Sequence, residues 1–142
     1  MPYQVSWYVP GHVILARMYG VVTIEDITKS NDEYMKLLHS VEGRVHTLAD
    51  LSDVEKFPLN IPQIMKAMKV ESERETGWML IVQKKPNPLL QYVAAMVGQI
   101  SVKKIRFRIL SDIPSAVQFL LQQDPTLDPK TFPALTQQET SV

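Results

Sequence analysis

The chain has 142 residues, of which 45% are hydrophobic and 21% charged, which is the composition of one globular domain. Fifteen basic residues balance fifteen acidic ones, so the chain lacks the basic surface that a nucleic-acid binder needs. The absence of cysteine excludes disulfides, thiolate metal ligands and cysteine nucleophiles. No signal-peptide pattern opens the sequence, and no apolar run approaches the roughly 20 residues of a membrane span, so we expect a cytoplasmic protein without an integral membrane segment.

The first twenty residues predict an antiparallel hairpin. Residues 3–9, "YQVSWYV", alternate in polarity and are rich in aromatic and β-branched side chains, as a half-buried strand is. Pro10 and Gly11 supply a turn, and residues 12–20, "HVILARMYG", form the second strand. Because the connection is short, the two strands run in opposite directions.

A helix and a parallel strand are predicted next. Thr23 is a good N-cap, and Asp26 stands three residues later, where its side chain can complete a capping box. One helical face carries five apolar side chains, with Asn31 as a polar exception: Ile24, Ile27, Tyr34, Leu38 and Val41. Residues 44–51, "RVHTLADL", form the third strand, which we expect to be parallel to the second because a helix separates them.

The second half of the chain continues the alternation of helix and strand. We expect a helix over about 61–74, a central strand at 78–83, a helix opened by Asn87-Pro88, a fifth strand at 103–110, and a last helix capped by Ser111 or Asp112. Cations alternate with apolar residues in the fifth strand, as is typical of an edge strand protected against unwanted pairing. We favour this interpretation; the alternative is a surface for an anionic partner.

The predicted architecture is therefore a single α/β domain over residues 1–123. Its element order is β-β-α-β-α-β-α-β-α, with a mixed β-sheet of about five strands and about four helices. Residues 124–142 are proline-punctuated and predict an irregular C-terminal tail, with Phe132 or Leu135 docked on the body.

Several segments together resemble the SpoIIAA-like branch of the STAS-domain proteins. They are the opening tryptophan strand, "ARMYGVVTIEDI" (16–27), "ADLSDVEKF" (49–57) and "SDIPSAVQFL" (111–120). The resemblance implies the fold and a loop that contacts partners. In the anti-sigma-factor antagonists of that superfamily a "DSSG" motif follows and carries a phosphorylated serine. Its positions correspond here to Pro58, Leu59, Asn60 and Ile61, which offer no hydroxyl, so the phospho-switch is not carried over.

Four polar side chains gather at the end of the third strand: Asp50, Ser52, Asp53 and Glu55. With His46 they suggest a cation or phosphoryl site, but the strand rise separates His46 from Asp50 by about 13 Å, too far to chelate one ion. The other interpretation is that Asp50 and Ser52 bond loop amides while Asp53 and Glu55 face water. We favour this second interpretation and predict no metal site.

Enzyme motifs are absent from the sequence. There is no glycine-rich phosphate loop, no G-x-S-x-G elbow, and no triad spacing around His12, His39 or His46. We therefore expect no catalytic residue, no cofactor and no enzymatic activity.

Two functional hypotheses from different classes remain. The first is a non-enzymatic interaction or regulatory domain that contacts another protein through the loop from Ser52 to Asn60, and a homo-oligomer such as a homodimer fits it. Its predicted partner-contact residues are Asp50, Ser52, Asp53, Glu55, Phe57 and Asn60. The second is a carrier of a small hydrophobic, lipid-like ligand between sheet and helices. Its predicted pocket residues are Met65, Met68, Trp78, Tyr92 and Met96.

Overall fold

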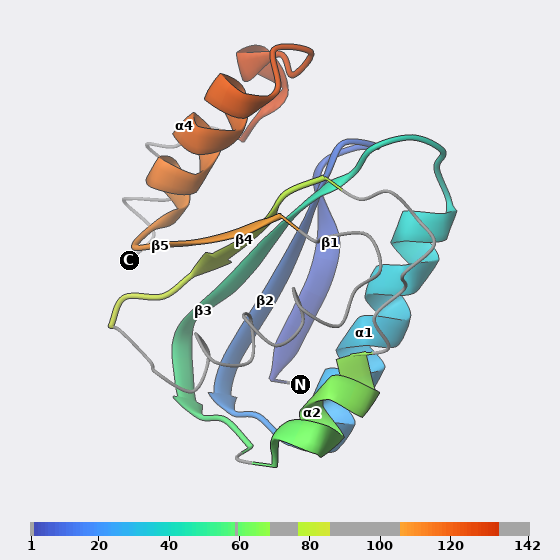
Figure 1. The fold of residues 1–142 in the computed structure, drawn as a ribbon, viewed down its shortest axis with the longest axis vertical. Coiled ribbons are helices and arrows are strands. Elements are labelled where there is room, and N and C mark those ends of the chain that lie inside the picture. The colour runs from blue at the N-terminus through green and yellow to red at the C-terminus, as the bar shows by residue number, and fades with distance from the viewer. Residues whose placement is uncertain (1, 59, 69–76, 86–105, 134–142) are drawn as a thin grey trace.

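The computed structural model describes residues 2–58, 60–68, 77–85 and 106–133. They form a five-stranded sheet with α1 and α2 on one face and α4 on the other (Figure 1). The strands are β1 (Tyr3–Val9), β2 (Val13–Val21), β3 (His46–Lys56), β4 (Met79–Val82) and β5 (Phe107–Leu110). The helices are α1 (Ile24–His39), α2 (Ile61–Met68) and α4 (Ile113–Gln123), with a short 3-10 turn η1 (Pro129–Thr131).

The strand order in the sheet is β1-β2-β3-β4-β5. β1 and β2 pair antiparallel, and the later pairs are parallel, which confirms the predicted hairpin, the parallel crossover and the mixed sheet. The fifth strand lies at the edge, as predicted. Three α-helices stand in the described residues, against about four predicted; the helix expected from Asn87-Pro88 and positions 69–74 of the second helix lie outside them.

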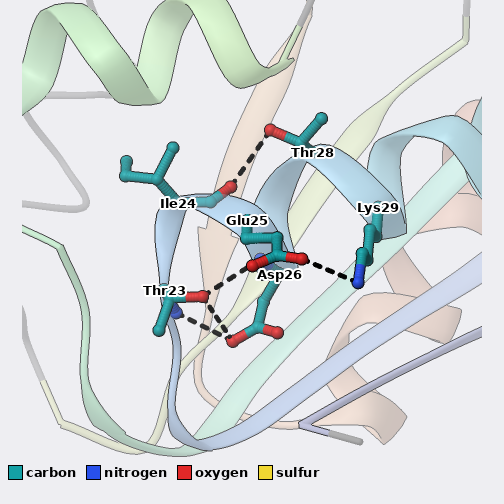
Figure 2. A network of polar contacts seen from close by, with 6 residues as sticks. All are labelled: Thr23, Ile24, Glu25, Asp26, Thr28 and Lys29. Atoms are coloured by element: carbon teal, nitrogen blue, oxygen red, sulfur yellow. Dashed lines mark hydrogen bonds and ion pairs between the residues drawn. The ribbon is translucent and has the colours of Figure 1, made fainter.

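The start of α1 is closed by a capping box (Figure 2). The Thr23 hydroxyl oxygen accepts a hydrogen bond from the Asp26 amide at 3.2 Å, and Asp26 Oδ2 accepts one from the Thr23 amide at 2.9 Å. This reciprocal pair satisfies two amides that a helix start leaves without partners, and it confirms the predicted capping box. Lys29 and Glu25, one turn apart and both exposed, add an ion pair at 2.8 Å.

Apolar side chains cover both faces of the sheet, as parallel strands require. On the α4 face, Leu48 and Leu80 pack against Ala116 and Leu120, and all four are fully buried. The other face holds two clusters under α1 and α2, one around Ile14, Leu38 and Val45 and one around Val22, Ile27, Ile64 and Ala67. The alternation along each strand thus fixes which side chains face α4.

The first part of the predicted tail packs on the domain. Leu127 is buried in the α4-face core, and the Phe132 ring meets the Tyr8 ring edge-on at 6.0 Å between centroids. The predicted docking of Phe132 is confirmed, and Leu135 lies outside the described residues. Residues 124–133 therefore complete the core rather than trail from it.

None of the helices in the described part of the chain combines the length and the apolar character needed to cross a membrane.

Candidate functional site

Asp50, the first of the predicted partner-contact residues, is buried and already paired. Its Oδ2 lies 3.2 Å from Arg17 Nε, and its Oδ1 accepts a hydrogen bond from the Ser52 amide at 3.1 Å. Arg17 reaches it because the parallel pairing of β2 and β3 sets Arg17 opposite Asp50. The carboxylate thus forms an Asx turn and an ion pair, as in the interpretation favoured from the sequence.

The segment after Asp50 is strand and not loop, which corrects one prediction. Residues 52–56 continue β3 and pair with the end of β2, so only the residues between Lys56 and α2 connect strand to helix. Acidic residues and serine disfavour strands, but pairing with β2 outweighs that preference. Asp53 is exposed and lies 3.8 Å from Lys84 Nζ, and Glu55 is exposed.

The remaining two predicted contact residues lie around the start of α2. Phe57 is half-buried against the cluster of Ile64 and Val22. Asn60 is exposed, and its side-chain oxygen accepts a hydrogen bond from the Gln63 amide at 3.1 Å. α2 begins at Ile61, the position that the resemblance aligns with a helix-opening glycine. An asparagine N-cap stands directly before it, where the resemblance expects a serine.

Exposed apolar side chains adjoin this segment on β2. Tyr19 is 39% exposed and Val21 is 56% exposed, and both stand out as large hydrophobic residues left open to solvent in the described part of the chain. Tyr19 is in register with Asp53, and Val21 with Lys56. We call Tyr19, Val21, Asp53 and Glu55 the strand-end patch. Sequence reasoning found its acidic half and missed its apolar half, because the register between β2 and β3 does not show in the sequence.

A second cluster, which the sequence did not reveal, lies at the opposite end of β3. His46 is 2% exposed, and its Nε2 lies 2.8 Å from Asp124 Oδ2. Its Nδ1 accepts a hydrogen bond from the Trp78 amide at 2.9 Å. An open pocket of about 670 Å³ adjoins the pair; its lining is Gly11, His12, Glu42, Gly43, Arg44, His46, Asp124, Thr126 and Leu127.

The His46–Asp124 pair resembles half of a catalytic triad, but its hydrogen bonds are all used within the protein. Because the Trp78 amide can only donate, Nδ1 is an acceptor and Nε2 carries the proton donated to Asp124. A general base needs a free ring nitrogen facing a nucleophile, and His46 offers none. The pair therefore fastens the end of α4 to the starts of β3 and β4.

The surroundings favour neutral His46 and ionised Asp124. Burial lowers the pKa of His46 below 6.5, outweighing the hydrogen bond and the charge of Asp124, and Arg44 and Arg106 repel the protonated ring. Burial opposes ionisation of Asp124, but hydrogen bonds from His46 and Thr126 overcome it and lower the pKa of Asp124 from 3.8 to about 2. Both pKa shifts favour the same state, in which the neutral His46 ring donates a hydrogen bond to the ionised Asp124 carboxylate.

Acid is expected to weaken the fold in two steps. The folded pKa of His46 lies below its unfolded value of 6.5, so the stabilisation is complete above that pH and is lost as the pH falls through and below it. The contribution of Asp124 is present above pH 3.8 and is lost as the pH falls towards about 2. Urea unfolding at a series of pH values measures both steps. The His12→Gln variant is the control and should keep the loss of stability near pH ~6.5, whereas His46→Gln should remove it. A wild-type free energy of unfolding that stays constant from pH ~7.5 to ~5 contradicts the role of His46 in this loss.

The predicted hydrophobic pocket is only partly within the described residues. Tyr92 and Met96 lie outside them; Met65 and Met68 belong to α2, whose packing lies on the α1 face. The indole of Trp78 packs edge-on against Phe119 of α4 at 4.8 Å between ring centroids, on the other face of the sheet. The structure therefore does not bring Trp78 together with α2, and ligand binding stays a prediction.

No group of three or more histidine, aspartate or glutamate side chains in the described ranges is arranged to hold a metal ion. Two of the acidic side chains at the end of β3 are paired with cations instead, Asp50 with Arg17 and Asp53 with Lys84.

Comparison with known proteins links the chain to one fold. No protein-family model matches it, and no curated protein does. Among solved structures, it is similar to an uncharacterized protein of the DUF3478 family with a SpoIIAA-like fold from Shewanella loihica PV-4. The two share 13% identity with a TM-score of 0.58, over 83% of this chain and 91% of that one. The likeness agrees with the order of strands and helices above, and the chain has a SpoIIAA-like fold.

Proposed function

We propose that the chain is a non-enzymatic protein-interaction domain whose contact surface is the strand-end patch. The observation that supports it most is the exposure of Tyr19 and Val21 beside the acidic end of β3. Exposed apolar side chains with a polar surround are typical of contact surfaces, and tyrosine is enriched there because it buries much area at little entropic cost.

The chemistry of the described residues supports a binding role over catalysis. The buried carboxylate of Asp50 is neutralised by Arg17, and both nitrogens of His46 are hydrogen-bonded. To act as a base, a nucleophile or an ion ligand, either group would first have to break a contact that stabilises the fold. The resemblance to the SpoIIAA-like domains implies a partner surface in the same segment.

A photo-crosslinking amino acid placed at position 19 tests the proposal. In cells that make the protein, we expect Tyr19→benzoylphenylalanine to give a discrete adduct, because the side chain lies in the contact surface. The same amino acid at Gln122, exposed on α4, is the matched control and should give none. Val21→Asp combined with the probe should abolish the adduct and lower the melting temperature by only a few degrees, since the exposed strand position makes the cost at most about 1 kcal/mol.

The outcomes are distinct. An adduct with a second copy of the chain identifies the partner as the predicted homodimer, and an adduct with another protein identifies a heterologous one. Equal adducts at positions 19 and 122, or no adduct at position 19, contradict the strand-end patch. Mass spectrometry of the adduct decides between these results.

A further inference from the structure

The edge of β5 that faces away from β4 carries backbone N–H and C=O groups that can pair with another strand. The carbonyls of Arg106 and Leu110 accept hydrogen bonds from Met79 and Gln83 amides on the β4 side, at 2.8 and 3.0 Å. Backbone groups of successive residues in a strand point to opposite sides, so Phe107 and Ile109 present theirs to the outer side. In the described part of the chain no strand pairs with that side.

Two arginines stand beside this edge, on one face of the sheet. The Arg106 guanidinium lies 5.2 Å from the centre of the Trp78 ring, and that of Arg108 lies 4.9 Å from the centre of the Phe119 ring. Both side chains belong to exposed residues. Trp78 and Phe119 pack edge-to-face against each other, so the aromatic base under the two cations is fixed.

No carboxylate of the described residues pairs with Arg106 or Arg108. Arg17, Lys29 and Lys84 each pair with an acidic side chain, whereas Arg106 and Arg108 form no ion pair within the described ranges. A cation–π contact does not use all five N–H donors of a guanidinium, so N–H groups remain for an acceptor. The opposite edge of the sheet, β1, contains no charged residue.

We propose that the β5 edge binds an extended acidic segment of another protein by strand addition. The backbone of that segment pairs with Phe107 and Ile109, and carboxylates at alternate positions meet Arg106 and Arg108, which are two residues and so about 7 Å apart. Two cations held over aromatic rings, beside backbone groups that no described strand pairs with, complement an acidic strand in both charge and spacing. A single-stranded nucleic acid fits less well, because the guanidinium groups cover the rings on which bases would stack. This surface shares no residue with the strand-end patch.

Three peptides test the proposal on the whole chain: acetylated and amidated Val-Glu-Val-Glu-Val-Glu, the same sequence with lysine for glutamate, and the same sequence with proline for valine. We expect the first peptide alone to bind. Binding should shift the backbone amide signals of Phe107 and Ile109 in NMR spectra and protect both amides from hydrogen exchange. Arg106→Gln with Arg108→Gln should weaken it roughly tenfold, since two charge contacts are lost. Lys36→Gln with Lys130→Gln removes two exposed cations elsewhere and should leave affinity unchanged.

Several results would overturn the proposal. One is no binding of the glutamate peptide, and another is binding that the double arginine variant leaves intact. Equal binding of the proline peptide, with the Ile109 amide unshifted, would show charge attraction without strand addition. Tight binding of an oligothymidine that depends on the same two arginines would assign the edge to nucleic acid instead.

Discussion

His46→Ala is expected to lower the free energy of unfolding by roughly 3–5 kcal/mol, a large share of the stability of a domain this size. The substitution leaves a cavity where a fully buried ring was, and it leaves the Trp78 amide and the Asp124 carboxylate without their partner. Each buried polar group left unpaired costs about 1–3 kcal/mol on its own. Urea unfolding at pH ~8, where the ring is neutral, measures the loss.

Asp124→Asn shows whether the loss comes from the hydrogen bonds or only from volume. Asparagine has the shape of aspartate, but Asp124 accepts from His46 at one oxygen and from the Thr126 amide at the other. Either orientation of the amide sets an N–H group against a donor, so we expect a loss of about 1–3 kcal/mol. His12→Ala, at an exposed position of the turn between β1 and β2, is the control and should cost little. A change below about 1 kcal/mol in both His46→Ala and Asp124→Asn contradicts the fastening role.

Gly77→Ala is expected to cost about 1–3 kcal/mol through overpacking. A Cβ at this position would lie 2.4 Å from His46 Nδ1 and 2.9 Å from the Val45 carbonyl oxygen. His46 cannot move aside, because it is hydrogen-bonded at both ring nitrogens. Thermal and urea unfolding of the variant measure the effect.

A double-mutant cycle gives the control for this clash. In the His46→Ala background the nearest obstructing atoms are gone, so Gly77→Ala should cost clearly less there. Gly11→Ala is the matched comparison, since a Cβ at Gly11 meets no atom within 4 Å and its φ of +77° is the sole obstacle. Equal costs for Gly77→Ala in both backgrounds would show that contact with His46 is not the cause.

Features that depend on neighbouring residues could be predicted from the sequence. The Thr23 capping box, the hairpin of β1 and β2 and the edge position of the fifth strand were predicted and are present, and the cap of α4, predicted as Ser111 or Asp112, is Asp112. Each depends on spacings of a few residues or on apolar period, which the sequence displays directly.

Contacts between distant residues could not be predicted. Arg17 meets Asp50 only through the register of two parallel strands, and His46 meets Asp124 across 78 positions. No pattern in a single sequence indicates either of these two contacts. The strand character of residues 52–56 was missed for a related reason, because pairing with β2 overrides their weak local preference. The position of Trp78 could not be predicted either, because it depends on the packing of its ring against Phe119 of α4.

The link from His46 to Asp124 also bears on the order in which the chain folds during synthesis. β3 leaves the ribosome before α4, and until α4 follows, no helix in the described part of the chain covers Leu48 and Leu80. The α1 face can pack early, because α1 is adjacent in sequence to the hairpin it covers. Among the described elements, the apolar side chains of the α4 face therefore receive their helical cover only when residues 113–132 have emerged, later than those of the α1 face.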